Sequence, residues 1–503
     1  MSAALLFSMV VIYFIVLLIV AHFTSKGSDN HSFFIGNKNS NWKLVAFGMI
    51  GTSLSGVTFV SVPGTVGTQY FVYFLVVIGY LLGYFAIAYI LLPLYYRLNL
   101  TSIYSYLHTR FGITSYKTGS VFFIISRTVG ATGRLFLVIY VLHQIFVLQQ
   151  IHIPFWVVAF IILAMIVLYT FKGGVKTIVF TDTLQTTFML VGLIVCAYYI
   201  LQGMHMNIGD AVTEMKGRGF FHMVEADFHH PKFFLKQILG GMFITIAMTG
   251  LDQEMMQKNI SVKTLKDSQK NMISFSFILV VVNLIFLFLG GLLFLYKSRF
   301  TIPQTDDALF PTIAMQYLPA GISIIFILAL ISALFPSADG AITALTSSFC
   351  IDILGINRNT ALSNQKRMRI RKTVHVSFAV IFFICILIFK EMGNTSIINL
   401  ILDLAGYTYG PLLGLFVFGI FTKRKLRERL VPIVCVIVPL ICFGLKLLSE
   451  TGKPAGSPLQ KFVYQFNDSG HNLLGGYNIG IELLIINGLL TYVGLLMISK
   501  KTI

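Results

Sequence analysis

The stretch Ser332-Ala-Leu-Phe-Pro-Ser-Ala-Asp-Gly-Ala-Ile-Thr-Ala-Leu-Thr-Ser-Ser348 places a carboxylate, a proline and six hydroxyls within an otherwise apolar segment. An ionised aspartate at the centre of a bilayer costs about 3 kcal/mol, so a segment that keeps one needs a cation or water beside it. Pro336 also frees the carbonyl four residues earlier in a helix, that of Ser332. Carboxylate, hydroxyl and carbonyl oxygens can replace the water shell of a small cation. The stretch therefore predicts an ion site inside a membrane.

The composition extends this prediction to the whole chain. Of 503 residues, 56% are hydrophobic and 11% are charged, and a soluble protein of this length could not bury so much apolar surface. The net charge of +18 resides in short basic loops between apolar runs, a distribution that orients a membrane protein and does not indicate a nucleic-acid partner. The five cysteines lie in apolar runs without metal-ligand spacing, so we interpret them as core residues. We expect an all-α polytopic membrane protein surrounded by lipid, with no obligate protein partner evident.

Thirteen apolar runs approach the length of about 20 residues that a spanning helix needs. They cover residues 5–22, 44–62, 71–93, 119–146, 153–170, 179–202, 237–257, 272–296, 322–350, 373–389, 397–421, 430–448 and 478–498. If the N-terminus is outside, the inside loops carry 25 Lys and Arg residues, Lys258 among them, and the outside loops carry 9. Because basic residues collect in cytoplasmic loops, we expect an outside N-terminus and a cytoplasmic C-terminus. The expected location is a plasma membrane, such as a bacterial inner membrane.

Two of these runs are poor helix formers. The second contains Gly48-Met-Ile-Gly-Thr-Ser-Leu-Ser-Gly-Val-Thr58 and then Pro63, and the seventh contains Gly240-Gly241, Thr245 and Thr249-Gly250. Clusters of Gly and hydroxyl residues within spans indicate discontinuous helices, whose unwound backbone needs a cavity or surrounding protein. The two runs are five spans apart, as expected for corresponding helices of an inverted-repeat transporter. Glycine-rich packing between helices is the alternative interpretation.

Four segments in order together resemble the sodium/solute symporter family, which includes sodium-coupled carriers of sugars, proline, iodide, vitamins and sialic acid. The segments similar to the first, fifth, eighth and tenth core helices of the family are Gly51-Thr-Ser-Leu-Ser-Gly-Val-Thr-Phe-Val-Ser-Val-Pro-Gly64, Thr181-Asp-Thr-Leu-Gln185 after Gly173-Gly174, Ala333-Leu-Phe-Pro-Ser-Ala-Asp-Gly340, and Gly406-Tyr-Thr-Tyr-Gly-Pro411 through Arg424. The resemblance runs from about residue 30 to 430.

The resemblance implies a LeuT-type core of five-plus-five helices in an inverted repeat, with one helix before it and two after it. The implied division is an N-terminal helix and first cytoplasmic loop at 1–43, a first repeat at 44–202, a second repeat at 203–424 and two C-terminal helices at 425–503.

The resemblance also implies a sodium site between the first and eighth core helices. The expected ligands are the backbone carbonyls of Gly51, Leu54 and Ala333 and the hydroxyl of Ser337. Position 336 is usually serine in the family and is proline here. Either the site works with one hydroxyl fewer, or the carbonyl that the proline frees replaces it.

A second cation position is implied lower in the fold. Some members, including sialic acid carriers, hold a second sodium with a fifth-helix aspartate and eighth-helix hydroxyls. Asp182 matches that aspartate, while Asp339 and Gly340 stand where the hydroxyls are expected. The two carboxylates can share a sodium ion; proton coupling or a structural pairing of aspartate with hydroxyls is the competing interpretation.

The substrate of this fold is expected beside the broken helices. By position, the residues that face it are Ser53, Ser55 and Thr58 in the first core helix and Thr245, Met248 and Thr249 in the sixth. Sugar carriers place large polar or aromatic side chains at several of these positions. The small hydroxyl residues here favour an anion or another small solute.

Arg127 and Arg134 are seven residues apart and therefore lie on one helix face. Arg127 is about 12 Å from the inner end of its helix and can snorkel to the cytoplasm, whereas Arg134 is near the centre. A fixed guanidinium beside hydroxyls is a good carboxylate receptor, and the resemblance to sialic acid carriers implies this role beside Ser55 and Thr58. Two interpretations stay nearly level: Arg134 holds the solute carboxylate, or it pairs with Asp182 or caps helix carbonyls.

We expect sodium-coupled symport of a small organic solute by alternating access, with Na⁺ as the coupling ion. The favoured solute is carboxylated, such as a sialic acid or another organic anion. The alternatives are a proton-coupled or neutral-solute symporter of the same fold, or a sensor or ion leak that does not transport. An enzyme is not expected, because the chain lacks the His-Glu-x-x-His and Gly-x-Ser-x-Gly motifs and a hydrophilic domain.

Overall fold

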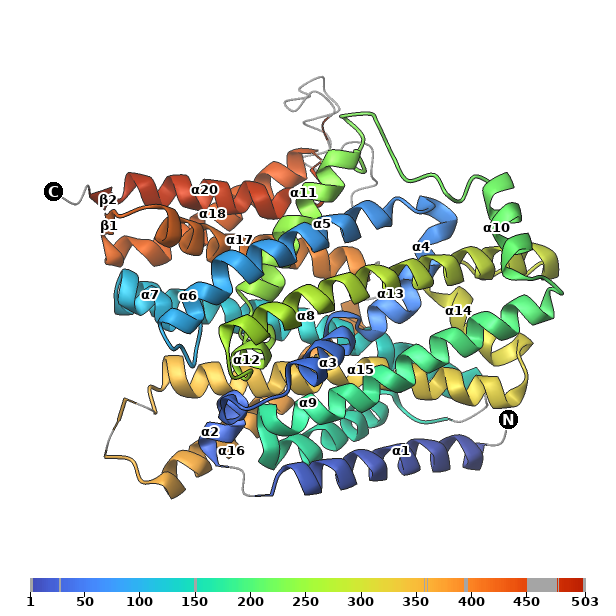
Figure 1. Cartoon of the computed structure of the whole chain (residues 1–503), viewed down its shortest axis with the longest axis horizontal. Helices are drawn as coiled ribbons and strands as arrows, with labels where there is room; N and C mark the ends of the chain where they lie inside the picture. Colours follow the sequence, from blue (N-terminus) through green and yellow to red (C-terminus); the bar gives the residue numbers. More distant parts are fainter. Residues whose placement is uncertain are drawn as a thin grey trace.

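The structure is a computed structural model that describes residues 3–26, 29–148, 152–356, 358–359, 361–392, 397–449, 477 and 479–500. Residues 450–476, which lie between the two predicted C-terminal helices, are therefore outside the described residues. The described chain is nearly all helical, and its long helices run side by side in roughly the same direction (Figure 1). This arrangement confirms the all-α fold class.

The elements of the first half of the chain are α1 (Ala3–Thr24), α2 (Asn30–Ile35), η1 (Gly36–Lys38), α3 (Trp42–Ser53), α4 (Gly56–Gln69), α5 (Tyr73–Ala86), η2 (Ile87–Leu91), α6 (Leu92–Arg97), α7 (Ser105–Arg110), α8 (Ile113–Leu148) and α9 (Phe155–Gly203). Gly174 in α9 has a φ of +53°, a left-handed conformation that glycine adopts without strain. It divides α9 into two apolar helices, close to the boundary that the sequence predicts between its fifth and sixth runs.

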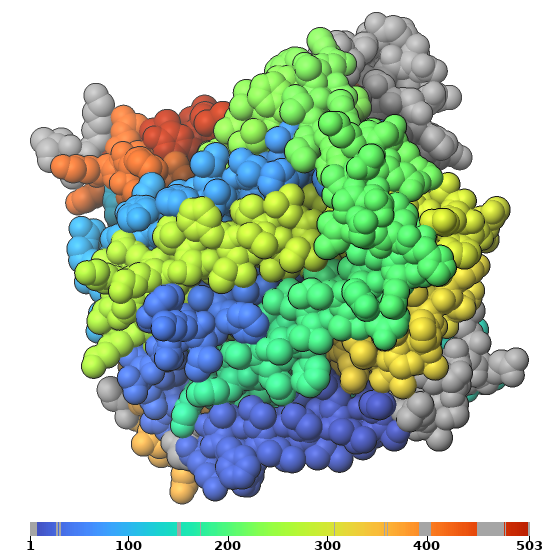
Figure 2. All heavy atoms as spheres, turned by 45° about the vertical axis from the view of Figure 1, so that its right-hand side comes forward, coloured from blue at the N-terminus to red at the C-terminus, as the bar shows by residue number. Residues whose placement is uncertain are grey.

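The second half contains α10 (Ile208–Gly217), α11 (Phe234–Thr245), η3 (Ile246–Gly250), α12 (Gln253–Ile260), α13 (Leu265–Phe300), η4 (Asp306–Ala308), α14 (Leu309–Thr312), η5 (Ile313–Tyr317), α15 (Ala320–Ser348), η6 (Phe349–Ile353), α16 (Asn364–Met392), α17 (Ile397–Phe421), β1 (Lys425–Leu426), η7 (Glu428–Leu430), α18 (Val431–Ser449), α20 (Leu483–Met497) and β2 (Ser499–Lys500). The two short strands pair antiparallel and join the end of α17 to the end of α20. Figure 2 shows one face of the molecule, where α1 lies beside α9 and α13 lies beside α5.

Within the described residues, 8 helices are long and apolar enough to cross a membrane, or up to 10 if each of two bent pairs is one span. Three shorter apolar helices cover Ser8–Thr24, Phe155–Phe171 and Leu483–Met497. The polytopic prediction is therefore confirmed. The count of thirteen spans stays a prediction.

Both runs that the sequence predicts to be discontinuous are bent. The axes of α3 and α4 differ by 58°, and those of α11–η3 and α12 by 66°. The first break falls at Leu54, whose φ and ψ of −91° and 81° are not helical. A Cβ at Gly56 would lie 2.1 Å from Val138 of α8, so only a glycine lets the start of α4 approach α8 this closely. In the second run the break comes after Gly250. Earlier in the same run, Gly241 packs against α5, because a Cβ there would lie 2.3 Å from the Val76 carbonyl oxygen. Glycine packing and helix breaking thus both occur.

The opening stretch of sequence lies at the centre of the bundle. Helix α15 packs against α3, α8, α9 and α12, and every residue from Ala329 to Ser348 is buried. The polar side chains of this stretch are therefore surrounded by other helices and not by lipid.

Candidate functional site

The first predicted cation position lies where α3 ends against α9 and α15. Gly51 is buried, and a Cβ there would lie 2.4 Å from Thr186 Oγ1 and 3.4 Å from Pro336 Cγ. The Gly51 N–H donates a hydrogen bond to Thr186 Oγ1 at 3.1 Å. Because α3 ends at Ser53 and its last helical hydrogen bond is from the Leu54 N–H to the Ile50 carbonyl, the carbonyls of residues 51–53 have no helical partner further along. The structure thus brings the end of α3 directly against α15 at Pro336.

The other predicted ligands of this position are also buried. Leu54 is at the break, and Ala333 and Ser337 lie on either side of Pro336 in α15. Ser337 Oγ donates to the Leu334 carbonyl at 3.0 Å, so its own lone pairs remain available to a cation. A set of buried carbonyl and hydroxyl oxygens is the kind of donor set that suits sodium. Thr186 is a neighbour that the sequence analysis did not single out, although it is one helical turn after Asp182.

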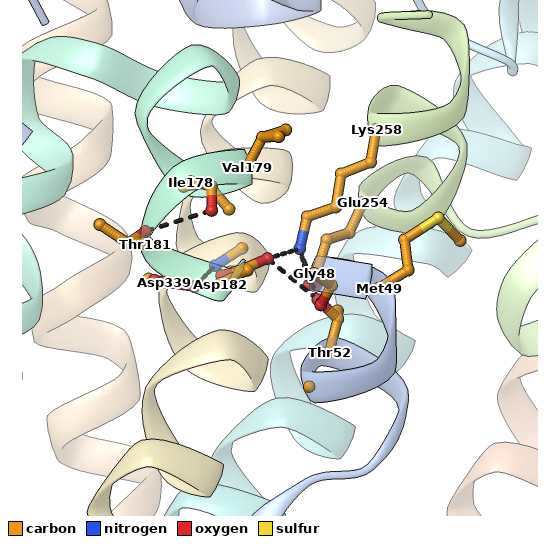
Figure 3. A network of polar contacts seen from close by, with 12 residues as sticks. Gly48, Met49, Thr52, Ile178, Val179, Thr181, Asp182, Glu254, Lys258 and Asp339 are labelled. Carbon is orange, nitrogen blue, oxygen red and sulfur yellow. Dashed lines mark hydrogen bonds and ion pairs between the residues drawn. The ribbon is translucent and has the colours of Figure 1, made fainter. Parts of the chain in front are cut away.

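The second predicted cation position contains a lysine. The Lys258 ammonium lies 2.6 Å from Asp182 Oδ2 and 2.6 Å from Thr52 Oγ1 (Figure 3). Thr52 Oγ1 in turn donates to Asp182 Oδ2 at 3.1 Å. The same ammonium is 3.7 Å from Glu254 Oε1, one helical turn away in α12. A protein cation therefore already neutralises the carboxylate that the sequence assigns to a second sodium.

Asp339 is held separately from this ion pair. The Tyr169 hydroxyl of α9 donates to Asp339 Oδ2 at 2.5 Å. Gly340 faces α12, because a Cβ there would lie 2.2 Å from Glu254 Oε1. Both carboxylates that could share an ion thus accept hydrogen bonds from hydroxyls, Thr52 for one and Tyr169 for the other.

Two basic residues are located differently from the sequence expectation. Lys258 is 2% exposed and belongs to a buried helix, so its inclusion among the cytoplasmic loop residues is wrong. Arg127 does not snorkel: it is 3% exposed, it forms an ion pair with Glu254, and its guanidinium is 3.7 Å from Asp252. Tyr409 of α17 donates to the same Asp252 at 2.9 Å. One sequence signal indicates this network: two acidic residues and a lysine lie within seven residues, Asp252-Gln-Glu-Met-Met-Gln-Lys258, directly after the predicted helix break.

The predicted substrate residues gather around the two breaks. The Tyr84 hydroxyl of α5 interacts with both Ser53 and Thr249, which joins the first break to the second. Thr245 lies against Gly83 of α5, where a Cβ would be 2.7 Å from the Thr245 Cβ.

The hydroxyl residues nearest the first break lie at the start of α4, which packs against α8. Ser55 directly precedes Gly56 and Thr58 is two residues after it, and a Cβ at Gly56 would meet Val138, one helical turn beyond Arg134. Neither hydroxyl makes a hydrogen bond within the part of the chain that the structure describes.

Arg134 lines a small cavity of about 10 Å³ between α8, η3 and α17, together with Arg127, Met248 and Tyr409. This volume is close to the minimum that one water molecule needs. A Cβ at Gly130, one turn before Arg134, would meet nothing within 4 Å. Among the described residues, Arg134 makes no ion pair with Asp182 and donates no hydrogen bond to a carbonyl. Within the described part of the chain, the Arg134 guanidinium therefore lines the cavity without an ion pair or hydrogen bond, while the neighbouring Arg127 is paired.

Comparisons with known proteins bear on the family and the fold of the chain. The sequence model of the sodium:solute symporter family matches residues 33–428. A sodium/sialic acid symporter, NanT of Aliivibrio fischeri, is 24% identical over 438 residues, which are 83% of this chain and 82% of that protein. The mouse sodium-coupled monocarboxylate transporter 2 is 25% identical over 408 residues, covering 78% of this chain and 64% of the transporter. A solved structure of a Na⁺-coupled sialic acid symporter, substrate-bound and outward-open, superposes with a TM-score of 0.80 over 99% of both chains at 18% identity.

Proposed function

This chain belongs to the sodium:solute symporter family, and we propose that it carries a small carboxylated solute across the membrane together with sodium, by alternating access. The observation that carries the choice of solute is the unpaired guanidinium of Arg134 in its cavity beside the two breaks. A charged side chain within a span is costly unless it meets an opposite charge. A solute carboxylate supplies that charge.

The geometry around Arg134 suits a carboxylate better than a neutral solute. A guanidinium can donate two parallel hydrogen bonds to a carboxylate, which fixes the orientation of the anion. Ser55 and Thr58 offer further hydroxyl donors near the first break, and Met248 gives the cavity an apolar wall. The relatives named as sialic acid and monocarboxylate carriers transport carboxylated solutes, which supports the same class here.

Sodium couples to this transport at the end of α3. We assign its ligands to the carbonyls of Gly51, Leu54 and Ala333 and to the hydroxyl of Ser337. Support comes from their burial, from the break that leaves carbonyls of α3 unpartnered, and from the contact of Gly51 with Pro336. A bound cation would join α3 to α15, and its release would loosen that junction.

The architecture that we propose has thirteen spans in a five-plus-five inverted repeat, with the four divisions predicted from the sequence. The two bent pairs, the other 8 long helices and the three shorter apolar helices support this count. The repeat is supported by the breaks in corresponding helices. We propose that the N-terminus is outside and the C-terminus cytoplasmic, in a plasma membrane of the bacterial inner type. The family and the relatives are transporters, so we propose no enzymatic step.

Uptake by proteoliposomes that contain the full chain tests the solute class. Labelled N-acetylneuraminate, pyruvate, proline and glucose are supplied with an inward sodium gradient. We expect a carboxylated, net anionic solute to accumulate, and Arg134→Ala to lower its uptake at least tenfold. Arg218→Ala is the matched control, because Arg218 forms only an exposed pair with Glu214. Unchanged uptake by the Arg134 variant would contradict the anion receptor.

The second candidate is proton coupling, which is favoured by the two buried carboxylates Asp182 and Asp339. An inward proton gradient without sodium distinguishes the two. We expect no uptake under that condition.

A further inference from the structure

We propose that the Lys258 ammonium is the resident cation at the Asp182 position, so that sodium does not bind between Asp182 and Asp339. This inference rests on the proposed sodium symport and deepens it. It assigns to each transport cycle only the sodium held at the end of α3. A side chain of the protein takes the place of a second transported ion.

The contacts of Lys258 are those of a cation in its binding site. Its ammonium has three N–H donors, and two of them meet acceptors at 2.6 Å, the carboxylate of Asp182 and the hydroxyl of Thr52. The third has Glu254 Oε1 at 3.7 Å. The side chain is 3% exposed, so water does not compete for these acceptors. Figure 3 shows the Lys258 side chain extending from α12 toward Asp182 and Thr52.

A sodium ion at the same carboxylate would be too close to this ammonium. Bonds from hard cations to oxygen are about 2.4 Å long. With the ammonium 2.6 Å from Asp182 Oδ2, a sodium on that oxygen would lie within about 5 Å of it, and a sodium on Oδ1, which has no hydrogen-bond partner among the described residues, would lie within about 7 Å. Like charges at this separation repel strongly where water is excluded.

The other charged groups around the position leave Lys258 as the partner of Asp182. Glu254 also pairs with Arg127, and Asp252 accepts a hydrogen bond from Tyr409. Asp339 accepts its hydrogen bond from Tyr169, and among the described residues it forms no ion pair with Lys258 within 4 Å. Asp182 is therefore the carboxylate whose charge the lysine neutralises most directly.

The position of Lys258 in the fold adds a mechanical consequence. Helix α12 is the second half of one broken helix, and Thr52 lies in the first half of the other. The lysine joins these two helices to α9, as a shared ion would. Because the lysine is covalently attached, it cannot be released to the cytoplasm and contributes no driving force from the sodium gradient.

The number of sodium ions bound tests the inference. Equilibrium binding of ²²Na⁺ is measured on the purified full-length protein, with the folded fraction selected by size exclusion. We expect the wild type to bind one ion, and Asp182→Asn to bind one as well. Lys258→Met, which keeps the length of the side chain without its charge, exposes Asp182 and Thr52 to the solvent ion, and we expect it to bind two. Lys258→Met combined with Asp182→Asn should return to one.

Lys263→Met is the matched control, because Lys263 is exposed and lies five residues further along the chain. We expect it to bind one ion. A wild type that binds two ions, one of them lost in Asp182→Asn, would overturn the inference and leave sodium symport intact. This result needs no Lys258 variant, so it stands even if those variants fail to fold. No sodium bound by any folded form would overturn sodium coupling and this inference together.

Discussion

Removing the charge of either Lys258 or Asp182 alone should destabilise the protein far more than removing both charges together. Removing one partner of a buried ion pair costs about 3–5 kcal/mol, because the other charge stays desolvated and uncompensated. At the observed 2.6 Å, and with an effective dielectric constant of about 20, the attraction between the two charges is of the order of 6 kcal/mol. The pair is buried, so little of this attraction is screened by salt.

The assay is a double-mutant cycle of the free energy of unfolding, measured by urea titration in detergent. We expect Lys258→Met and Asp182→Asn each to lower this free energy by about 3–5 kcal/mol. We expect the double variant to lose at least about 2 kcal/mol less of this free energy than the sum of the two single losses, because no unpaired charge then remains buried. The single losses should also persist at high salt.

The control cycle uses the exposed pair of Arg218 and Glu214, whose side chains are each 39% exposed. There we expect a coupling of about 0.3–0.5 kcal/mol that salt abolishes. Additive effects at Lys258 and Asp182, or single losses below about 1 kcal/mol, would refute the reasoning, because they are typical of exposed pairs.

Gly340→Ala should lower stability by about 1–3 kcal/mol, because its Cβ would lie 2.2 Å from Glu254 Oε1. Gly321→Ala in the same helix is the control, because a Cβ there meets open space and should be neutral or stabilising. Thermal unfolding compares the two variants, and equal effects would contradict the packing of α15 on α12. Glu254→Gln should cost about 1–3 kcal/mol, because the buried Arg127 then keeps only the more distant Asp252 at 3.7 Å as a carboxylate partner, and denaturant titration measures this loss. Tyr169→Phe should cost about 1–3 kcal/mol by removing the donor to Asp339, and an unchanged unfolding temperature would show that this hydrogen bond is unimportant.

The sequence predicts the breaks well because their causes are local. Gly51, Ser55 and Gly56 lower helix propensity within a few residues, and the chain bends at Leu54 between them. The stretch around Asp339 was predicted to hold buried polar groups because polarity in an apolar run is visible without knowing the fold.

The role of Lys258 could not be predicted in the same way. A lysine that follows an apolar run resembles a topology signal, and only the tertiary arrangement places α12 against α3 and α9. The snorkelling expected of Arg127 is wrong for a related reason. Its distance from the helix end allows snorkelling, but Glu254 and Asp252 from a distant part of the chain pair with it inside the bundle. Pairings between residues more than 70 positions apart leave no periodic pattern in a sequence.

The transport of a carboxylated solute with sodium is tested most directly by comparing an acid with its uncharged ester. Initial uptake of labelled N-acetylneuraminate and of its methyl ester is measured in proteoliposomes with an inward gradient of either sodium or choline. We expect rapid uptake of the acid with sodium, at least tenfold above the rate with choline, and no sodium-driven uptake of the ester, because Arg134 then has no carboxylate to bind. Equal uptake of the acid with sodium and choline, or equal sodium-driven uptake of acid and ester, would contradict sodium-coupled transport through an arginine receptor.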